Sequence, residues 1–256
     1  MGQRIYILTH DERIFHPRLF HSVLSRNPGS FEFIGAAIVR RRKTETTRSL
    51  VEHLFHLGGI YGVLRVASLL AFRRLGAILG MGGPVSVRAV FDAHGIPVKE
   101  IDSPNQPDFV EWLRAQRPDI VFCAITPILK TPILQTPRLA CVNRHAGKLP
   151  DYRGGEPVFH ALRRREQSVT VTYHTMVEEL DGGSVLWEHA ESVEDRDTVF
   201  SLYGRLFEAS SHGFWPAMAE LPNGGIRTVD LSRGATYRRP TPEEIAEFHR
   251  VGRRYV

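Results

Sequence analysis

Three polar residues in the second half of the chain have the types and spacing needed to activate a carbonyl group. Asn143 and His145 end an apolar segment and are two residues apart, so in an extended strand their side chains point to the same side. An amide and an imidazole that converge on one point can polarise a carbonyl and stabilise the oxyanion formed when it is attacked. Asp181 closes a loop further along the chain and can orient the histidine or carry a proton. Each is also an ordinary turn or capping residue, so their joint occurrence is what favours a catalytic site.

Other common chemistries lack their motifs. The densest glycine cluster, Gly76 to Gly83, does not have the G-x-G-x-x-G spacing of a dinucleotide site and does not follow a strand. The phosphate-binding loop, the paired C-x-x-C and H-E-x-x-H metal motifs, and the G-x-S-x-G nucleophile elbow do not occur either. We therefore expect no nicotinamide cofactor and no metal site.

The elements that must position these residues follow a strand, helix, strand order. Apolar β-branched runs predict strands at 5–8, 31–39, 119–125 and 139–142, and helical spacing predicts helices at 17–24, 85–94 and 157–165. This order builds a parallel sheet by crossover connections. Asn143 directly follows the last of these strands, and open parallel sheets bind ligands at the carboxyl ends of their strands. Further helices are predicted from the N-cap Asn105 to Gln116, from Asp197 to Glu220 with a bend or early end at Pro216, and after the capping box at Thr241.

Residues 44–83 interrupt this rhythm with about forty residues of leucine-rich helical pattern. Such a segment suits an amphipathic cap that packs on the body or on a partner, or a helix on a membrane surface aided by Arg65, Arg73 and Arg74. Its glycines favour the cap, because they permit close helix packing. The same arginines interrupt the most apolar stretch, 57–81, so we expect no transmembrane segment.

Composition bounds the class of protein. The chain has 256 residues, a formal net charge of +5, 42% hydrophobic residues and two cysteines, Cys123 and Cys141, both in apolar segments. These values are typical of a soluble globular protein with one large domain and a small appendage. The first eight residues do not have the pattern of a signal peptide, so we expect a cytoplasmic location. Basic runs such as 40–43 and 163–165 fit a solvated helix face, a phosphate-bearing substrate or nucleic acid, and charge alone leaves these open.

The sequence around the three polar residues resembles a known family. The motifs are Asn143-x-His145, Leu149-Pro150, Tyr152-Arg153-Gly154, Pro157 and Leu180-Asp181-x-Gly183. They resemble the signature of the folate-dependent formyltransferases, which include methionyl-tRNA formyltransferase, glycinamide ribonucleotide transformylase and the sugar N-formyltransferases. The resemblance covers residues 85–189 well and 5–39 loosely. It implies an α/β, Rossmann-like fold with a mostly parallel sheet, a catalytic domain over 1–190 with the insertion at about 44–83, and a C-terminal helix and extension over 191–256.

The resemblance also implies the chemistry. The co-substrate would be 10-formyltetrahydrofolate, with its formyl group passing to an amine. Asn143 and His145 would hold the formyl oxygen. Asp181 would orient the imidazole of His145 and receive the amine proton, while His174 would at most orient the site. The segment ending one strand would receive the pterin, and a loop would form its other wall; the corresponding residues are Thr126, Pro127, Leu129, Met176, Glu178 and Leu180.

Departures from the family pattern narrow the choice of acceptor substrate. Gly147 stands where the tRNA enzyme usually has serine and Lys130 where proline is common, and both are nearer to the sugar-modifying branch. Only 75 residues, 182–256, follow Asp181, too few for the C-terminal barrel of the tRNA enzyme. We therefore expect a small-molecule amine acceptor, specifically a nucleotide-linked amino sugar, no nucleic-acid partner, and either a monomer or a homodimer. The alternatives are a formyltetrahydrofolate hydrolase, methionyl-tRNA-type formyl transfer, and a non-catalytic folate-binding module.

Overall fold

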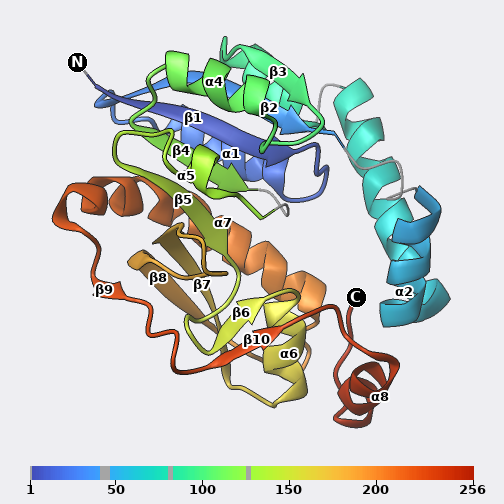
Figure 1. The fold of residues 1–256 in the computed structure, drawn as a ribbon. Coiled ribbons are helices and arrows are strands. Elements are labelled where there is room, and N and C mark those ends of the chain that lie inside the picture. Colours follow the sequence, from blue (N-terminus) through green and yellow to red (C-terminus); the bar gives the residue numbers. More distant parts are fainter. Residues whose placement is uncertain (1, 41–46, 80–82, 125–127) are drawn as a thin grey trace.

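The computed structural model of the chain describes residues 2–40, 47–79, 83–124 and 128–256. Its centre is an eight-stranded sheet (Figure 1). In order across the sheet the strands are β3 (Val98–Ile101), β2 (Phe31–Val39), β1 (Gln3–His10), β4 (Ile120–Ala124), β5 (Ala140–His145), β7 (Ser168–Thr175), β8 (Ser184–Ser192) and β9 (Arg227–Thr228). The first five are parallel, and β7, β8 and β9 continue the sheet antiparallel. The prediction of an α/β fold with a mostly parallel sheet is confirmed.

Helices cover both faces of the parallel part because its strands are apolar on both sides. Along β1, Ile5 and Ile7 pack with α1 (His16–Ser25), α3 (Val87–Ala93) and α7 (Val199–Glu220) in one core cluster. Tyr6 and Leu8 point the other way, into a second cluster with α4 (Pro107–Ala115) and α5 (Thr131–Leu134). Cys123 and Cys141 are buried as free thiols, as predicted.

The inserted helix, α2 (Thr47–Ile78), lies to the side of the sheet (Figure 1). It is interrupted at Gly59, whose φ of 62° and ψ of −166° are not helical. The predicted limits of the insertion, 44 and 83, reach into 44–46 and 80–82, which lie outside the described residues. By length and composition alone, the stretch Phe55–Gly76 passes a test that core helices of soluble proteins also pass, so it does not overturn the expectation of no transmembrane segment. Within the described residues it is the one stretch that passes this test.

The C-terminal segment returns to the middle of the chain. The strand β10 (Ala235–Tyr237) pairs in parallel with β6 (Tyr152–Gly154), so a two-stranded sheet forms just after β5. The helix α8 (Pro242–Arg250) begins at the predicted capping box, with Thr241 as its N-cap. It packs on α6 (Pro157–Arg163), where Phe159 and Phe248 stack with ring centroids 4.5 Å apart. A short 3₁₀ turn, Leu221–Asn223, follows α7.

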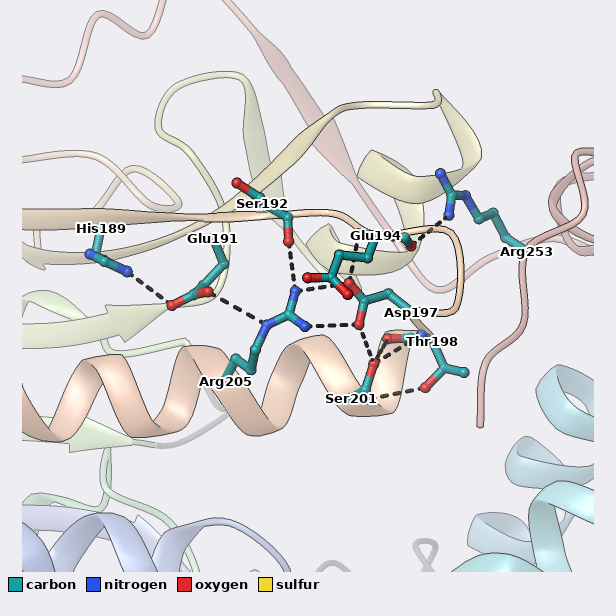
Figure 2. A network of polar contacts seen from close by, with 9 residues as sticks. All are labelled: His189, Glu191, Ser192, Glu194, Asp197, Thr198, Ser201, Arg205 and Arg253. Atoms are coloured by element: carbon teal, nitrogen blue, oxygen red, sulfur yellow. Dashed lines mark hydrogen bonds and ion pairs between the residues drawn. The ribbon is translucent and has the colours of Figure 1, made fainter.

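A polar network fastens the start of α7 (Figure 2). The N-cap is Thr198, which forms a capping box with Ser201, so the helix begins two residues after the predicted Asp197. The Asp197 carboxylate lies outside the helix and accepts a hydrogen bond from the Arg205 guanidinium at 2.8 Å. Arg205 also donates to the carbonyl of Ser192 at the end of β8, so one side chain joins the hairpin to the helix. The helix continues through Pro216 to Glu220 and is not shortened there.

Candidate active site

The three polar residues predicted from the sequence come together at the carboxyl end of β5. Asn143 and His145 lie on this strand, and Asp181 lies in the loop between β7 and β8. The antiparallel pairing of β5 with β7 places Asn143 opposite His174, which adds a second histidine to the group. The edge of the sheet where they meet is the one at which open α/β sheets bind ligands.

His145 is nearly buried and uses both ring nitrogens. Its Nε2 lies 2.6 Å from the carbonyl oxygen of Tyr152, which can only accept, so Nε2 carries the proton. Its Nδ1 lies 3.6 Å from Asp181 Oδ2, longer than a direct hydrogen bond. Because the proton of the neutral ring is on Nε2, Nδ1 has no hydrogen to donate to the Asp181 carboxylate. A hydrogen bond between the two groups forms only when the pair takes up one further proton. The arrangement therefore suits a pair that accepts a proton during a reaction.

His174 holds the amide of Asn143. The His174 Nδ1 lies 2.8 Å from the carbonyl oxygen of Thr175 and 2.9 Å from that of Gly182, so this nitrogen donates. Its Nε2 then accepts from Asn143 Nδ2 at 3.3 Å. Burial lowers the pKa of His174, with the Asp181 carboxylate opposing and His145 adding to the effect, so the ring stays neutral. One amide N–H of Asn143 is fixed in this way, and its second remains for a carbonyl oxygen.

Backbone geometry holds Asp181 in place. Its Oδ2 accepts a hydrogen bond from the amide of Gly154 at 2.6 Å, and its own φ is 52°. Two residues later, Gly183 has a φ of 89°, and a Cβ there would lie 2.3 Å from the Thr175 carbonyl oxygen. Only glycine satisfies both conditions, so the Asp181-x-Gly183 spacing has a steric cause.

Gly147 is required by the packing around His145. A Cβ at this position would lie 2.6 Å from His145 Nε2 and 2.6 Å from the Tyr152 carbonyl oxygen. Both atoms belong to the hydrogen bond that fixes the imidazole, so a serine here would displace it. The departure at Gly147 noted from the sequence is thus coupled to the orientation of the histidine in this chain.

The two backbone groups that complete the site were not predicted. They are the Tyr152 carbonyl, which accepts from His145, and the Gly154 amide, which donates to Asp181. Both lie in β6, which is paired to β10. Backbone groups carry no side-chain signal, so only the Tyr152-Arg153-Gly154 motif could have pointed to them.

The residues predicted to hold a pterin divide into three groups. Leu129 is buried in the same core cluster against which Met176 packs. Glu178 and Leu180 are exposed on the loop before Asp181. Thr126 and Pro127 lie outside the described residues. The structure therefore brings a strand-end segment and a loop to the same edge, without testing a ligand between them.

Asn105 does not cap a helix as predicted, because Gln106 is the N-cap of α4. Its side chain instead donates to the Ile128 carbonyl at 2.9 Å and accepts from the Lys130 amide at 2.9 Å. These bonds fix the backbone around Leu129. Beside it, the Ile128 side chain is exposed, as is Val177 on the opposite loop, and such apolar surface suits a flat aromatic ligand.

The enclosed space near the site is small. A cavity of about 100 Å³ has Ala146, Gly147, Tyr152 and Glu166 in its wall. Binding pockets for small molecules usually measure roughly 300–1,000 Å³. Asn143, His145 and Asp181 do not line this cavity.

The basic residues near the site differ in how they are used. Arg163 forms ion pairs with Glu244 and Glu247 of α8, and Arg164 donates to the Tyr237 hydroxyl. Both therefore support the C-terminal segment. Arg153 has a buried Nε without a hydrogen-bond partner among the described residues, and it directly precedes Gly154. Of these three arginines, Arg153 is the one that we consider for a ligand.

Arg144 points away from the site, between Asn143 and His145 on the strand. It is partly buried, lies 3.6 Å over the Phe207 ring and donates to Ser210 Oγ at 2.7 Å. Burial without a facing carboxylate lowers the pKa of Arg144 to about 10. Nearby, burial lowers the pKa of His16 to about 4, although the Glu12 carboxylate opposes this. The strand thus carries a partly buried cation on the face opposite its polar site residues.

Solved structures share the fold over most of the chain. Glycinamide ribonucleotide transformylase 1 from Symbiobacterium toebii has a TM-score of 0.61 at 18% identity, and 90% of this chain and 95% of that chain are covered. A sugar N-formyltransferase from a Shewanella species has a TM-score of 0.58 at 14% identity, with 97% and 87% covered. At these identities the similarity concerns the fold alone.

Curated relatives match over a shorter stretch at higher identity. Methionyl-tRNA formyltransferase from Bacillus mycoides is 31% identical over 173 residues, which cover 66% of this chain and 55% of the relative. The enzyme of that name from Thermotoga maritima is 36% identical over 157 residues, which cover 60% and 50%. The chain thus spans about half the length of the curated relatives it matches. Residues 87–218, about half of the chain and including Asn143, His145 and Asp181, match the family described as Formyl transferase, and the chain belongs to that family.

Proposed function

We propose that the chain transfers the formyl group of 10-formyltetrahydrofolate to a primary amine on a nucleotide-linked amino sugar. The observation that carries this proposal is the meeting of Asn143, His145 and Asp181 at the carboxyl end of β5, in a chain of the formyl transferase family. We infer that residues 1–190 act as the catalytic domain and 191–256 as an extension that supports it through β10.

The donor supplies an N-formyl carbonyl, and we assign its oxygen to the second N–H of Asn143. As the acceptor amine attacks the carbonyl carbon, negative charge develops on this oxygen, and a fixed N–H donor stabilises it. The amine loses a proton at the same time. Asp181 Oδ2 receives this proton, with the His145 Nδ1 sharing it. The folate nitrogen leaves with a proton that this pair returns.

For the donor, we assign the pterin to the space between the 128–130 segment and the loop that carries Val177, Glu178 and Leu180. The apolar side chains of Ile128 in this segment and of Val177 and Leu180 in the loop are exposed, which supports this assignment. Thr126, Pro127, Leu129 and Met176 complete the proposed set, with Leu129 and Met176 supporting it from the core.

The choice of a nucleotide-linked amino sugar rests on two observations. The sugar N-formyltransferase from a Shewanella species aligns along 97% of this chain and 87% of its own. Arg153, whose Nε has no hydrogen-bond partner within the part of the chain that the structure describes, is suited to a phosphate oxygen. The sequence identity of 31–36% to methionyl-tRNA formyltransferases supports methionyl-tRNA as the second candidate acceptor.

Release of tetrahydrofolate from 10-formyltetrahydrofolate tests the proposal. It is measured without acceptor, with a panel of nucleotide-linked amino sugars, and with methionyl-tRNA. We expect release that depends on an amino sugar and is lost in Asn143→Ala, while the exposed Asn223→Ala serves as the matched control. Equal release without any acceptor would indicate a hydrolase, and release with methionyl-tRNA alone would assign the second candidate. Folate binding without release would identify a binding module.

A further inference from the structure

The second part of α2 exposes a continuous apolar face. Its large side chains, together with that of Leu79 directly after the helix, are between 52% and 75% exposed; they are Ile60, Tyr61, Leu64, Phe72, Leu75 and Leu79. Ile60, Leu64 and Leu75 recur at helical spacing and lie on one side of the helix, with Tyr61, Phe72 and Leu79 next to them. Monomeric soluble proteins rarely leave so dense an apolar stripe in water, so this face is suited to a partner.

The opposite face of α2 is fixed to the body. Val66 is buried on the side of the helix away from the stripe, and Leu57, in the part of α2 before Gly59, is buried in the core cluster that includes Ala146 and Tyr152. The Arg73 guanidinium donates to the carbonyl oxygens of Ile14 and Pro84. A helix held by one face in this way cannot cross a bilayer while it remains docked. It runs along the side of the molecule with its outer face free of the sheet (Figure 1).

The charges around the stripe are of one sign. The sequence contains no aspartate or glutamate between Glu52 and Asp92. At 100° per residue, the exposed Arg65 and Arg74 lie on the two sides of the stripe. Arginines at the margins of an apolar face can extend their guanidinium groups to anionic headgroups while the face itself enters the acyl region. The face thus complements an anionic lipid surface in both shape and charge.

A second copy of the chain complements this face less well. Two such stripes packed against each other would bring both pairs of arginines together, and no carboxylate on the stripe could neutralise them. The same shortage of acidic groups does not affect a lipid partner, because the negative charge is supplied by the headgroups.

We propose that α2 binds the surface of an anionic phospholipid bilayer, lying in the interface with its apolar stripe inserted and the body held above it. Because α2 follows β2, it starts from the carboxyl edge of the sheet, at which Asn143 and His145 also lie. Docking therefore holds this edge close to the lipid surface. The proposal rests on α2 alone and does not depend on the proposed function.

Co-sedimentation of the full chain with vesicles tests the proposal. One set of vesicles is pure phosphatidylcholine, and the other contains 30% phosphatidylglycerol, on the order of the anionic content that such helices require. We expect at least about tenfold more bound chain on the anionic vesicles at low salt, with binding weakened as salt rises. Failure to bind the anionic vesicles, or equal binding to both sets, would overturn the proposal.

Two variants assign the binding to the stripe. Phe72→Glu introduces a charge at the most exposed apolar side chain of the stripe, and Ile226→Glu makes the same change at an exposed apolar residue elsewhere. We expect Phe72→Glu to lose at least about tenfold in vesicle binding and Ile226→Glu to bind like the original chain, with unchanged melting temperatures. Normal binding by Phe72→Glu would overturn the proposal. A dimer in analytical ultracentrifugation that Phe72→Glu dissociates would also overturn it, because the face would then belong to a second copy.

Discussion

The amide of Gly154 donates a hydrogen bond to Asp181 Oδ2 at 2.6 Å, across 27 positions of the sequence. The same oxygen faces His145 Nδ1 at 3.6 Å, so it serves both a permanent donor and a partner that donates only when protonated. Gly154 thereby fixes the position of the Asp181 oxygen that faces His145.

Replacing the carboxylate of Asp181 tests its role in proton transfer. Asp181→Asn keeps an oxygen that can accept from Gly154 but cannot receive a proton. We expect a loss on the order of a hundredfold or more in the rate of tetrahydrofolate release, with folate affinity largely unchanged. Steady-state kinetics and a folate titration check the two parts. Turnover close to that of the original chain would show that the reaction does not use this carboxylate.

The Asn143–His174 contact predicts a second loss. His174→Phe removes the acceptor that fixes the amide of Asn143, whereas His174→Gln retains a carbonyl that can accept. We expect kcat to fall by roughly tenfold to a hundredfold in the phenylalanine variant and by less in the glutamine variant. Asn143→Ala sets the lower limit of the series. Equal kcat values for all the His174 variants would contradict this orienting role.

The close contacts at Gly183 predict that its replacement by alanine costs more unfolding free energy than the same replacement at Gly224, although the two glycines have similar backbone angles. Gly183 and Gly224 have φ values of 89° and 83°, but only at Gly183 would a Cβ meet other atoms, the nearest at 2.3 Å. We expect Gly183→Ala to cost about 2–4 kcal/mol of unfolding free energy and Gly224→Ala about 1 kcal/mol. Urea denaturation measures both. Similar losses would mean that the backbone conformation alone, without the Thr175 contact, sets the requirement at Gly183.

The folding stability of the chain is expected to be sensitive to acid because of His16. Its pKa in the folded chain is lowered to about 4, mainly by burial, with Arg144 and His10 adding to the effect and Glu12 opposing it. Between about pH 6.5 and 4 the unfolded chain therefore binds more protons at this residue, so stability is full above this window and declines as the pH falls through it. The difference of about 2.5 units corresponds to about 3 kcal/mol.

His16→Gln removes this titration. Urea denaturation at pH 7 and pH 4.5 should therefore show a smaller loss of stability in the variant than in the original chain. An identical loss in both proteins would assign the acid sensitivity to other groups.

The sequence predicted those features of the molecule that depend on the type of side chain at each position. The apolar run of β1, the capping box at Thr241 and the spacing of Asn143 and His145 all depend on residue type, and the structure has each of them. Asn105 shows the limit, because its type suits an N-cap and also suits the bridge to Ile128 and Lys130 that it forms. Long-range backbone contacts such as Gly154 with Asp181 have no local signal.

The pairing of β6 with β10 implies that the candidate active site is completed late in folding. Tyr152 and Ala235 are neighbours in this small sheet although more than eighty positions separate them, so closing it orders a long stretch of chain. Contacts of this kind form late in folding, after the local helices and hairpins. A folding intermediate with a complete central sheet but an unattached C-terminal segment would therefore have an unsupported catalytic loop. Recovery of activity during refolding should lag behind recovery of the core.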